Sequence, residues 1–513
     1  MSRPIDTVVI GGGTSGLAAA IALARTGAGV VVVEAAPALG GLLREVEFAP
    51  GFRAAPLGGD AGWLPREVAR GLDLPELQPE DAGPRLAFDG NGGRLELGLD
   101  PAATAAAIRR FSARDAERWA GVAGQVHRLA GILGLLYVSP APRIDVDRIG
   151  ELFGLLKVGR RLRGLGKAEM VDFLRLVPMA VAETLDERFE SDLLKGALAA
   201  DALTDLAQGP MSGGTTFNLL HRHVGAPLGA LGVRPRFEPG RLVAALVDRA
   251  RSAGVELRPG ARVRRIATAG ERVAAVELDG GERIECRDVL SSLDPYRTML
   301  ELLDPALLDP DFIRAVRNIR FRGAASVVMV ALDGLPDGVP ERLSGLVVAP
   351  SLRFIERSYD DVKFRHPSAD PVVEVRFPAG GAPAGRRVAV IESRYTPYRP
   401  APDVPADLGA LTGERAIAAV DRVLPGFAGR VLHRAVLTPA DLEREFGMRE
   451  GAASHGEMML DQILFMRPVA GWSRYATPVP GLYLCGSGTH PGGGVVGASG
   501  WLAAQALLQG RKR

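Results

Sequence analysis

Cysteine is almost absent from this chain of 513 residues, which holds only Cys286 and Cys485. The two lie far apart and form neither a CxxC pair nor a metal-ligand spacing, which argues against a dithiol redox enzyme and a structural zinc site. We expect no bound metal. So few thiols in a long chain also suit a reducing compartment, and we expect a cytoplasmic protein.

The chain also lacks a large surplus of charge of either sign and a long apolar run. The 62 Lys and Arg residues against 60 Asp and Glu residues leave a net charge of +2 without a long basic block, so we expect no nucleic-acid partner. Residues 1–6 lead into an apolar run without the basic region and cleavage signal of a leader peptide. Apolar runs stay well below the roughly 18 residues of a spanning helix. We expect a protein that is soluble or peripheral to a membrane.

Glycine is abundant, and the pattern around the first glycines predicts a βαβ unit. Residues 7–10 form a short continuous apolar run that is typical of a buried parallel strand. Residues 16–25 read as an Ala-rich helix, and residues 30–33 as a second apolar strand that is closed by Glu34.

Between the first strand and the helix, Gly11, Gly13 and Gly16 form the pattern GxGxxG. The first glycine allows a tight turn, the second lets the backbone approach a pyrophosphate, and the third lets the helix pack closely on the strand. The helix N-terminus offers N–H groups to phosphates, and Glu34 would accept hydrogen bonds from ribose hydroxyls. The segment therefore predicts dinucleotide binding.

A glycine pair, Gly40-Gly41, follows Glu34 and precedes Arg44 and Glu45. A pair in this place resembles flavoproteins of the glutathione-reductase type, in which the backbone passes close to FAD. The pattern GxGxxG recurs only at Gly492, Gly494 and Gly497, inside the C-terminal glycine-rich segment, so we expect no separate nicotinamide domain. Electrons would leave to a diffusible acceptor, oxygen or a quinone, or return to the product in a net isomerisation.

A second glycine-rich segment lies at 481–500, between an apolar strand over 482–485 and an apolar helix over 501–508. Gly486 and Gly488 would let the backbone approach the phosphates and the ribityl chain. The amides of residues 492–497 would approach the flavin pyrimidine, where a helix N-terminus stabilises the negative charge of a reduced flavin. Cys485 ends the buried strand, where a thiol acts as a small hydrophobe, so we expect FAD to be bound non-covalently.

The length exceeds that of a single hydrophobic core, and the pattern along the chain predicts two domains. Helical periodicity dominates residues 76–225, including 103–137 and 146–204, and strands and helices alternate after residue 240. We expect an α/β protein with a Rossmann-like FAD-binding domain and a discontinuous α+β substrate domain. The expected bounds are 1–75, 226–300 and 455–513 for the FAD-binding domain, and 76–225 and 301–454 for the substrate domain.

Several motifs resemble one family of flavoproteins. They are Pro50-Gly51-Phe52, Thr438-Pro-Ala-Asp-Leu442, His455-Gly-Glu-Met458, Leu460-Asp-Gln462 and Phe465-Met-Arg-Pro468, together with the segment 481–500. By these motifs the chain resembles the phytoene desaturase-related FAD-dependent oxidoreductases, and within them the branch called pyridine nucleotide-disulfide oxidoreductase domain-containing protein 2. The resemblance implies an FAD-binding domain of the glutathione-reductase and amine-oxidase type. It also implies desaturation, saturation or isomerisation of hydrophobic, often isoprenoid, substrates.

The expected cofactor site combines the glycine-rich segments with Val263, whose contact with the adenine end is implied by the resemblance. The expected cofactor-binding residues are Gly11, Gly13, Thr14, Ser15, Gly16, Glu34, Ala35, Gly40, Gly41, Leu42, Val263, Gly486, Ser487, Gly488, Gly494, Val495 and Val496. His455 and Arg467 lie inside family-like motifs and are the candidate catalytic residues; a purely structural role is the alternative for both. The expected reaction removes hydride from a C–H bond of a hydrophobic small molecule, an isoprenoid or a polyene.

Two other functions stay open. A flavin amine oxidase shares this architecture but needs an aromatic cage, and only 5% of the residues are aromatic. The other is an FAD-stabilised binding protein without redox turnover.

Two stretches bear on the substrate and its source. Residues 151–167 mix leucines with basic side chains, which fits either an amphipathic helix in peripheral contact with a membrane or a solvated helix face. Where relatives commonly have Trp-Gly and then Gly-Gly-Met-Gly, this chain has Leu231-Gly232 and then Phe237-Glu-Pro-Gly240. We expect this stretch, residues 231–240, to lie near the flavin or the substrate entrance.

Overall fold

The GxGxxG turn joins strand β1 (Thr7–Ile10) to helix α1 (Thr14–Ala24) in the computed structural model of the chain. The structure describes residues 5–56, 60–79, 83–90, 92–142, 164, 166–336, 339–340 and 342–511. β1 pairs in parallel with β2 (Val30–Glu34), and both strands are buried up to Glu34. The predicted βαβ opening is confirmed.

A five-stranded parallel sheet is assembled from distant parts of the chain. Its strand order is β17-β11-β1-β2-β7. β7 (Glu256–Pro259) and β11 (Asp288–Ser291) come from the middle of the chain, and β17 (Leu482–Leu484) comes from its end. This sheet is the Rossmann-like core that the sequence predicts. The domain limits given above stay a prediction.

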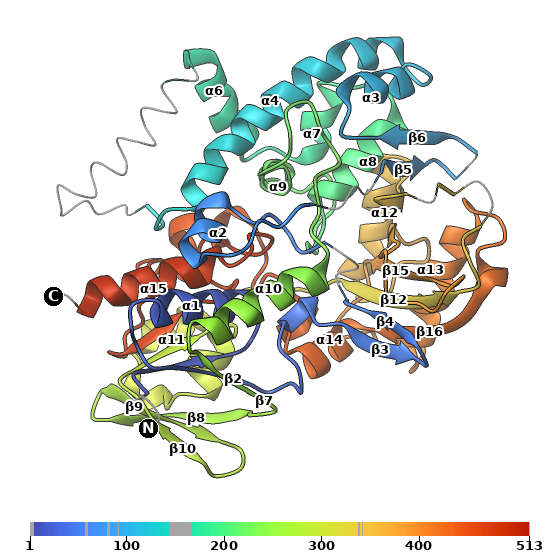
Figure 1. The fold of residues 1–513 in the computed structure, drawn as a ribbon. Coiled ribbons are helices and arrows are strands. Elements are labelled where there is room, and N and C mark those ends of the chain that lie inside the picture. Colours follow the sequence, from blue (N-terminus) through green and yellow to red (C-terminus); the bar gives the residue numbers. More distant parts are fainter. Residues whose placement is uncertain are drawn as a thin grey trace.

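Two layers cover this parallel sheet on opposite faces (Figure 1). Alternate residues of β1 face them, since Val9 packs in one apolar cluster with Leu17 of α1, and Val8 packs in another with Ile266. The first layer holds α1, α10 (Pro239–Ser252), α15 (Ala498–Arg511) and α2 (Arg66–Leu72). The second is the antiparallel sheet of β8 (Val263–Ala269), β9 (Arg272–Leu278) and β10 (Arg283–Glu285), with α11 (Pro310–Arg317) beside it.

A seven-stranded mixed sheet forms the centre of the second half of the molecule (Figure 1). In spatial order its strands are β16 (Val431–Leu437), β12 (Ala325–Leu332), β15 (Arg387–Arg394), β14 (Val373–Arg376), β13 (Gly345–Val348), β5 (Arg85–Phe88) and β6 (Arg94–Leu97). Helix α13 (Leu408–Asp421) packs its apolar side on one face. The hairpin of β3 (Val46–Ala49) and β4 (Phe52–Ala54) packs on the other, near α14 (Pro439–Phe446).

Helices surround the far end of this sheet. They are α3 (Pro101–Ile108), α4 (Ala113–Tyr137), α6 (Gly166–Leu176), α7 (Val181–Asp186), α8 (Asp192–Ala202), α9 (Thr215–Arg222) and α12 (Leu352–Lys363). The helical stretch predicted over 103–137 is divided at Ser112, because the Ser112 hydroxyl caps α4 by accepting from the Asp115 N–H at 3.1 Å. Residues 143–163 and 165 lie outside the described residues, and with them most of the stretch 151–167.

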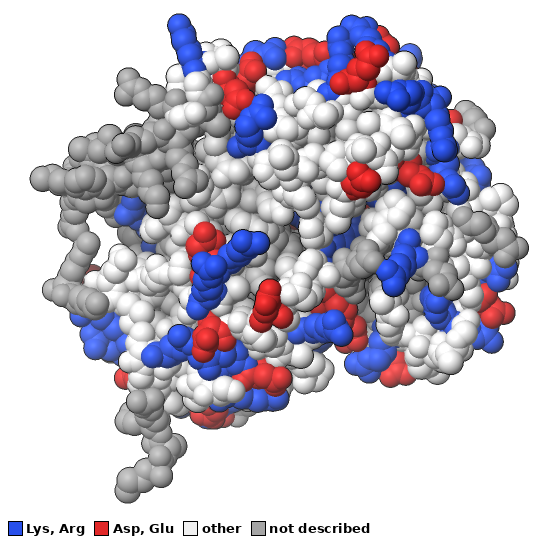
Figure 2. All heavy atoms as spheres, turned by 45° about the horizontal axis from the view of Figure 1, so that its top comes forward, with Lys and Arg blue, Asp and Glu red and all other residues white. Residues whose placement is uncertain are grey.

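Residues 76–225 are mostly helical, as the periodicity predicts, but they also contain the hairpin of β5 and β6, which joins the mixed sheet beside β13. Among the described residues, no helix has the length and apolarity that crossing a membrane requires. On the face seen in Figure 2, basic and acidic side chains are interleaved over the surface.

Candidate functional site

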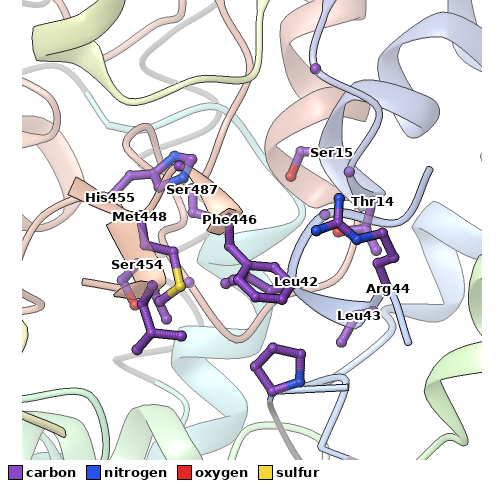
Figure 3. Close-up of a pocket in the computed structure, with 18 of the residues that line it drawn as sticks. Thr14, Ser15, Leu42, Leu43, Arg44, Phe446, Met448, Ser454, His455 and Ser487 are labelled. Carbon is purple, nitrogen blue, oxygen red and sulfur yellow. The ribbon is translucent and has the colours of Figure 1, made fainter. Parts of the chain in front are cut away.

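A cavity of about 740 Å³ lies where the parallel sheet meets the mixed sheet. Its walls include the N-terminus of α1, the segment after β2, the start of β8, the C-terminal glycine-rich segment and one face of β12, β14 and β15. A volume of several hundred Å³ is typical of cofactor and substrate sites. Figure 3 shows Thr14, Ser15 and Arg44 on one side of the cavity, and Met448, Ser454 and His455 on the other.

The N-terminus of α1 points a turn of backbone N–H groups at this cavity. Gly13, Thr14 and Ser15 line the wall. No side chain caps the helix at Gly13, and its first turn holds no acidic residue. Because the first N–H groups of a helix have no acceptor within the helix, this end is open to an anionic ligand such as a diphosphate.

The glycines beside this helix end form a cradle that side chains would fill. A Cβ atom added at Gly13 would meet only the Cα atom of Gly41, at 3.7 Å, so no protein contact in the described structure demands glycine there. Gly40 and Gly41 have φ angles of +120° and +59° and line the same wall. Close approach of a ligand explains Gly13, and the cradle fits a dinucleotide.

Glu34 stands at the end of β2, where a ribose-binding acid is expected. Its carboxylate accepts hydrogen bonds from the N–H groups of Gly12, at 2.7 Å, and Ala36, at 2.8 Å. An ionised carboxylate offers about four lone-pair positions, so these two bonds fix its orientation and leave capacity for ribose hydroxyls. Ala35 and Val263 line the cavity next to it.

The structure brings most of the predicted cofactor residues to this one cavity. The lining residues are Gly11, Gly13, Thr14, Ser15, Glu34, Ala35, Gly40, Gly41, Leu42, Val263, Ser487, Gly494, Val495 and Val496. Gly16, Gly486 and Gly488 do not line it. A Cβ atom at Gly16 would lie 2.0 Å from the Gly11 carbonyl oxygen, and one at Gly486 would lie 2.3 Å from that of Ser292. These glycines allow close backbone packing behind the cavity wall.

His455 lines the cavity in a strained backbone conformation, with a φ angle of +52°. Its Nδ1 atom is buried and has no hydrogen-bond partner among the described residues. Burial, with help from the Arg467 and Arg297 guanidinium groups, lowers the pKa of His455 from 6.5 to about 4. The imidazole is therefore neutral near pH 7.

Arg467 does not reach the cavity, which differs from the expectation of a catalytic group. Its side chain is 2% exposed and donates hydrogen bonds to the backbone carbonyls of Ser454, Gly456, Gln462 and Ser487. No carboxylate of the described residues forms an ion pair with it. Arg467 fastens the loop of His455 to the C-terminal glycine-rich segment, which makes it a positioning residue.

A set of charged residues that the sequence does not predict lies on the opposite wall. Asp60, Arg222, Arg234, Glu374, Arg376 and Glu392 line the cavity there. They come from five separate parts of the chain, and no local motif marks them. The closest signal was the departure of residues 231–240 from the pattern of relatives, because Arg234 lies inside that stretch.

The two cysteines take no part in the cavity wall. Both are buried and free. Burial raises the pKa of the Cys286 thiol to about 12 and raises that of Cys485 as well. Thiols of this kind are inert rather than redox-active.

Comparison with known proteins agrees with this picture of the site. The FAD binding domain family matches residues 6–289, more than half of the chain. Pyridine nucleotide-disulfide oxidoreductase domain-containing protein 2 of Rattus norvegicus is 31% identical over 99% of this chain and 94% of its own length. Hydroxyneurosporene desaturase of Rhodobacter capsulatus is 30% identical over 100% of this chain and 99% of its own.

A solved structure shows the same fold. Putrescine oxidase bound to putrescine has a TM-score of 0.64 to this chain at 15% identity, with 100% of both chains covered. The predicted FAD cofactor and the predicted fold class are confirmed. A chain that shares its whole length with these relatives, and more than half of it with the FAD binding domain family, is an FAD-dependent oxidoreductase of the phytoene desaturase-related family.

Proposed function

We propose that this oxidoreductase is a desaturase or dehydrogenase that removes hydride from a C–H bond of a largely apolar substrate. The observation that carries the proposal is the continuity of the cavity. It runs from the nucleotide cradle to a chamber walled by Val327, Val390 and Met448, beside His455. A relative of full length is named hydroxyneurosporene desaturase, which supports an isoprenoid or polyene as the substrate class.

FAD, when bound, supplies the hydride acceptor. The residues proposed to hold it non-covalently are the α1 N-terminus for the diphosphate, Glu34 for the ribose, and residues 494–496 for the pyrimidine end. Val263 would contact the adenine end. Arg467 holds the His455 loop on the glycine-rich segment, and His455, which lines the cavity, would take up a proton. Oxygen or a quinone is the proposed electron acceptor.

An amine oxidase is the less favoured alternative. Phe446 is the only Phe, Tyr or Trp among the described residues that line the cavity. The Arg44 guanidinium lies 4.8 Å from its ring centroid, on the side of the cofactor cradle. An aromatic cage around an amine therefore has no counterpart among these residues.

Anaerobic mixing of the purified holoprotein tests the proposal. The flavin absorbance is followed after addition of carotenoid-type polyenes in one series and primary amines in another. We expect bleaching by polyenes and none by amines. Bleaching by amines alone would replace the desaturase by an amine oxidase, and no bleaching in either series would favour an FAD-stabilised binding protein.

A further inference from the structure

The charged wall of the cavity belongs to a larger buried ionic cluster. Its cations are Arg85, Arg222, Arg234, Arg236, Arg376 and Arg394. Its anions are Asp60, Asp201, Glu374 and Glu392. Ionised side chains are rarely buried unless they are paired, because removing a charge from water is costly. The balance of charge inside this cluster therefore matters.

Two carboxylates hold most of the cluster together. Asp60 lies 3.0 Å from Arg222 and 2.8 Å from Arg234. Burial alone would raise the pKa of Asp60, but the guanidinium groups, Arg234 first, hold it well below its usual range.

Glu374 plays the same part on the mixed sheet. It lies 3.3 Å from Arg85, 3.1 Å from Arg376 and 3.1 Å from Arg394. Burial raises its pKa, yet the three arginines reverse that shift and lower it. Both carboxylates are ionised, and each already serves several cations.

The cluster nevertheless has more positive than negative charge. Six guanidinium groups face four carboxylates, a surplus of two. Arg236 is 8% exposed and forms no ion pair with any described residue; it donates to the Ser344 carbonyl, and its Nε atom has no partner there. Burial, followed by the neighbouring Arg376, lowers the pKa of Arg236 to about 10. Asp205 is not part of this cluster, because its carboxylate accepts hydrogen bonds from the N–H groups of Ala453 and Ser454 and from the Ser454 hydroxyl and forms no ion pair with the six arginines among the described residues.

The cluster meets the cavity at three of its arginines, Arg222, Arg234 and Arg376, and at three of its carboxylates, Asp60, Glu374 and Glu392. The side-chain hydrogen bonds of Arg222 within the described structure use only Nη2, which donates to Asp60, and its buried Nε has no hydrogen-bond partner there. Guanidinium groups have fixed donor directions that match a carboxylate or phosphate.

Apolar residues lie beside this cationic corner on the same face of the mixed sheet. Val390 of β15 is the cross-strand neighbour of Arg376, and Val327 of β12 that of Glu392. Val327 and Val390 line the cavity with them. The chamber therefore offers a cationic corner and an apolar wall side by side, the complement of an amphiphile.

We propose that the chamber binds the anionic oxygen head group, a carboxylate or a phosphate, of an otherwise apolar substrate, on the cavity side of Arg222 and Arg234. This inference rests on the proposed function, because it names the substrate class of the same cavity. The head group would supply the counter-charge that the cluster lacks. A cationic amine would add to the surplus and is excluded from this corner.

Ligand binding to the holoprotein tests the proposal without turnover. Dodecanoate, dodecyl phosphate, dodecanol and dodecylamine share one tail and differ in the head group. Their dissociation constants are measured by calorimetry and by the change in the visible flavin spectrum. We expect one or both anions to bind at least about tenfold more tightly than the alcohol, the effect of a charge-assisted hydrogen bond, and the amine to bind most weakly. The tighter anion identifies the head group.

Arg234→Gln shows where the anion binds. We expect it to weaken binding of the preferred anion about tenfold and to leave the affinity for dodecanol unchanged. Arg422→Gln is the matched control, because Arg422 is an exposed partner of Asp370 on the surface. The comparison of the dodecanoate and dodecanol dissociation constants of the wild-type protein needs no variant. It therefore tests the head-group site even if Arg234→Gln does not fold.

Equal affinities for dodecanoate, dodecyl phosphate and dodecanol would overturn the head-group site, as would an equal loss for all ligands in Arg234→Gln. These outcomes differ from failure of the proposed function. If the protein binds the anions more tightly than dodecanol but no C–H donor bleaches the flavin, the head-group site stands and the proposed desaturase function fails. If neutral polyenes bleach the flavin but the anions bind no more tightly than dodecanol, the desaturase function stands and the head-group site fails.

Discussion

Gly13 and Gly16 belong to the same GxGxxG motif but have different roles. Replacing each of them with valine distinguishes the two roles. At Gly13 the described protein leaves room for a Cβ atom, and the backbone is extended, so Gly13→Val should fold. The side chain would occupy the cradle, and we expect no bound flavin. At Gly16 a Cβ atom would lie 2.0 Å from a backbone oxygen, so Gly16→Val should unfold the protein.

The measurements are the flavin absorbance of the purified proteins and their circular dichroism on heating. A yellow Gly13→Val protein with the wild-type ratio of flavin to protein would show that the assigned cradle is not the cofactor site.

His455 can be replaced without disturbing its backbone. Asparagine tolerates a positive φ angle better than most residues, so His455→Asn should keep both fold and flavin. Loss of a group that accepts a proton beside the reacting bond typically slows a reaction about a hundredfold. We expect flavin bleaching under single-turnover conditions to slow by that order, with substrate affinity little changed. An unchanged bleaching rate would reduce His455 to a structural residue.

At the scale of elements, a chain of hydrogen bonds ties α4 and α9 to the glycine-rich segment. The His221 Nε2 atom donates to the Gly493 carbonyl at 3.0 Å, which leaves Nδ1 to accept from the Tyr137 hydroxyl at 2.8 Å. All three groups are buried. Burial, more than the neighbouring arginines, lowers the pKa of His221 to about 3, so this arrangement of donors persists at neutral pH.

Tyr137→Phe removes one donor and leaves a buried imidazole nitrogen without a partner. Such a loss costs about 1–3 kcal/mol of stability. We expect urea denaturation of the holoprotein to show a decrease of that size, together with weaker FAD binding, because the segment beside Gly494 loses support. Tyr359→Phe, on the half-buried face of α12, is the control. Equal effects of the two variants would contradict a special role for this chain of bonds.

The elements that the sequence predicted best are those with a strong local pattern. The strand–turn–helix around Gly11 and the strand over 482–485 were placed within a few residues, because apolar periodicity and glycine positions are encoded locally. The hairpin of β5 and β6 was missed, because each strand has four residues and its partner β13 lies far along the chain. Tertiary pairing rather than local preference decides such strands.

At the scale of the whole molecule, the cofactor half of the cavity was predictable and the substrate half was not. The cradle is predictable because its glycines lie close together in sequence, within two short segments. The charged wall consists of Asp60 and of residues of α9, of the loop before α10, and of β14 and β15. The sequence alone does not distinguish a charged side chain that becomes buried from one that stays exposed. The polarity of the chamber is therefore a property of the fold.

Buried histidines link the two halves of the molecule and make its stability depend on pH. The His490 Nε2 atom donates to the Leu136 carbonyl at 3.0 Å, a contact between the C-terminal segment and α4. Burial, more than any neighbouring charge, lowers the pKa of His490 from 6.5 to about 4. The unfolded chain therefore takes up a proton before the folded one, and stability is lost as the pH falls from about 6.5 towards 4.

His490→Gln keeps a donor for the Leu136 carbonyl but cannot take up this proton. We expect the variant to be less stable than the wild type at about pH 7, where the imidazole packs against Tyr137 with 6.1 Å between ring centroids. Between about pH 7 and about pH 5 the wild type alone loses about 2 kcal/mol to the shifted titration, so the gap narrows by that amount. The carboxylates are the same in both proteins, so their contribution to the pH dependence cancels in the difference of the two free energies of unfolding. Urea denaturation of the two holoproteins at both pH values measures the gap, and a gap that does not change with pH would show that His490 titrates normally in the folded protein.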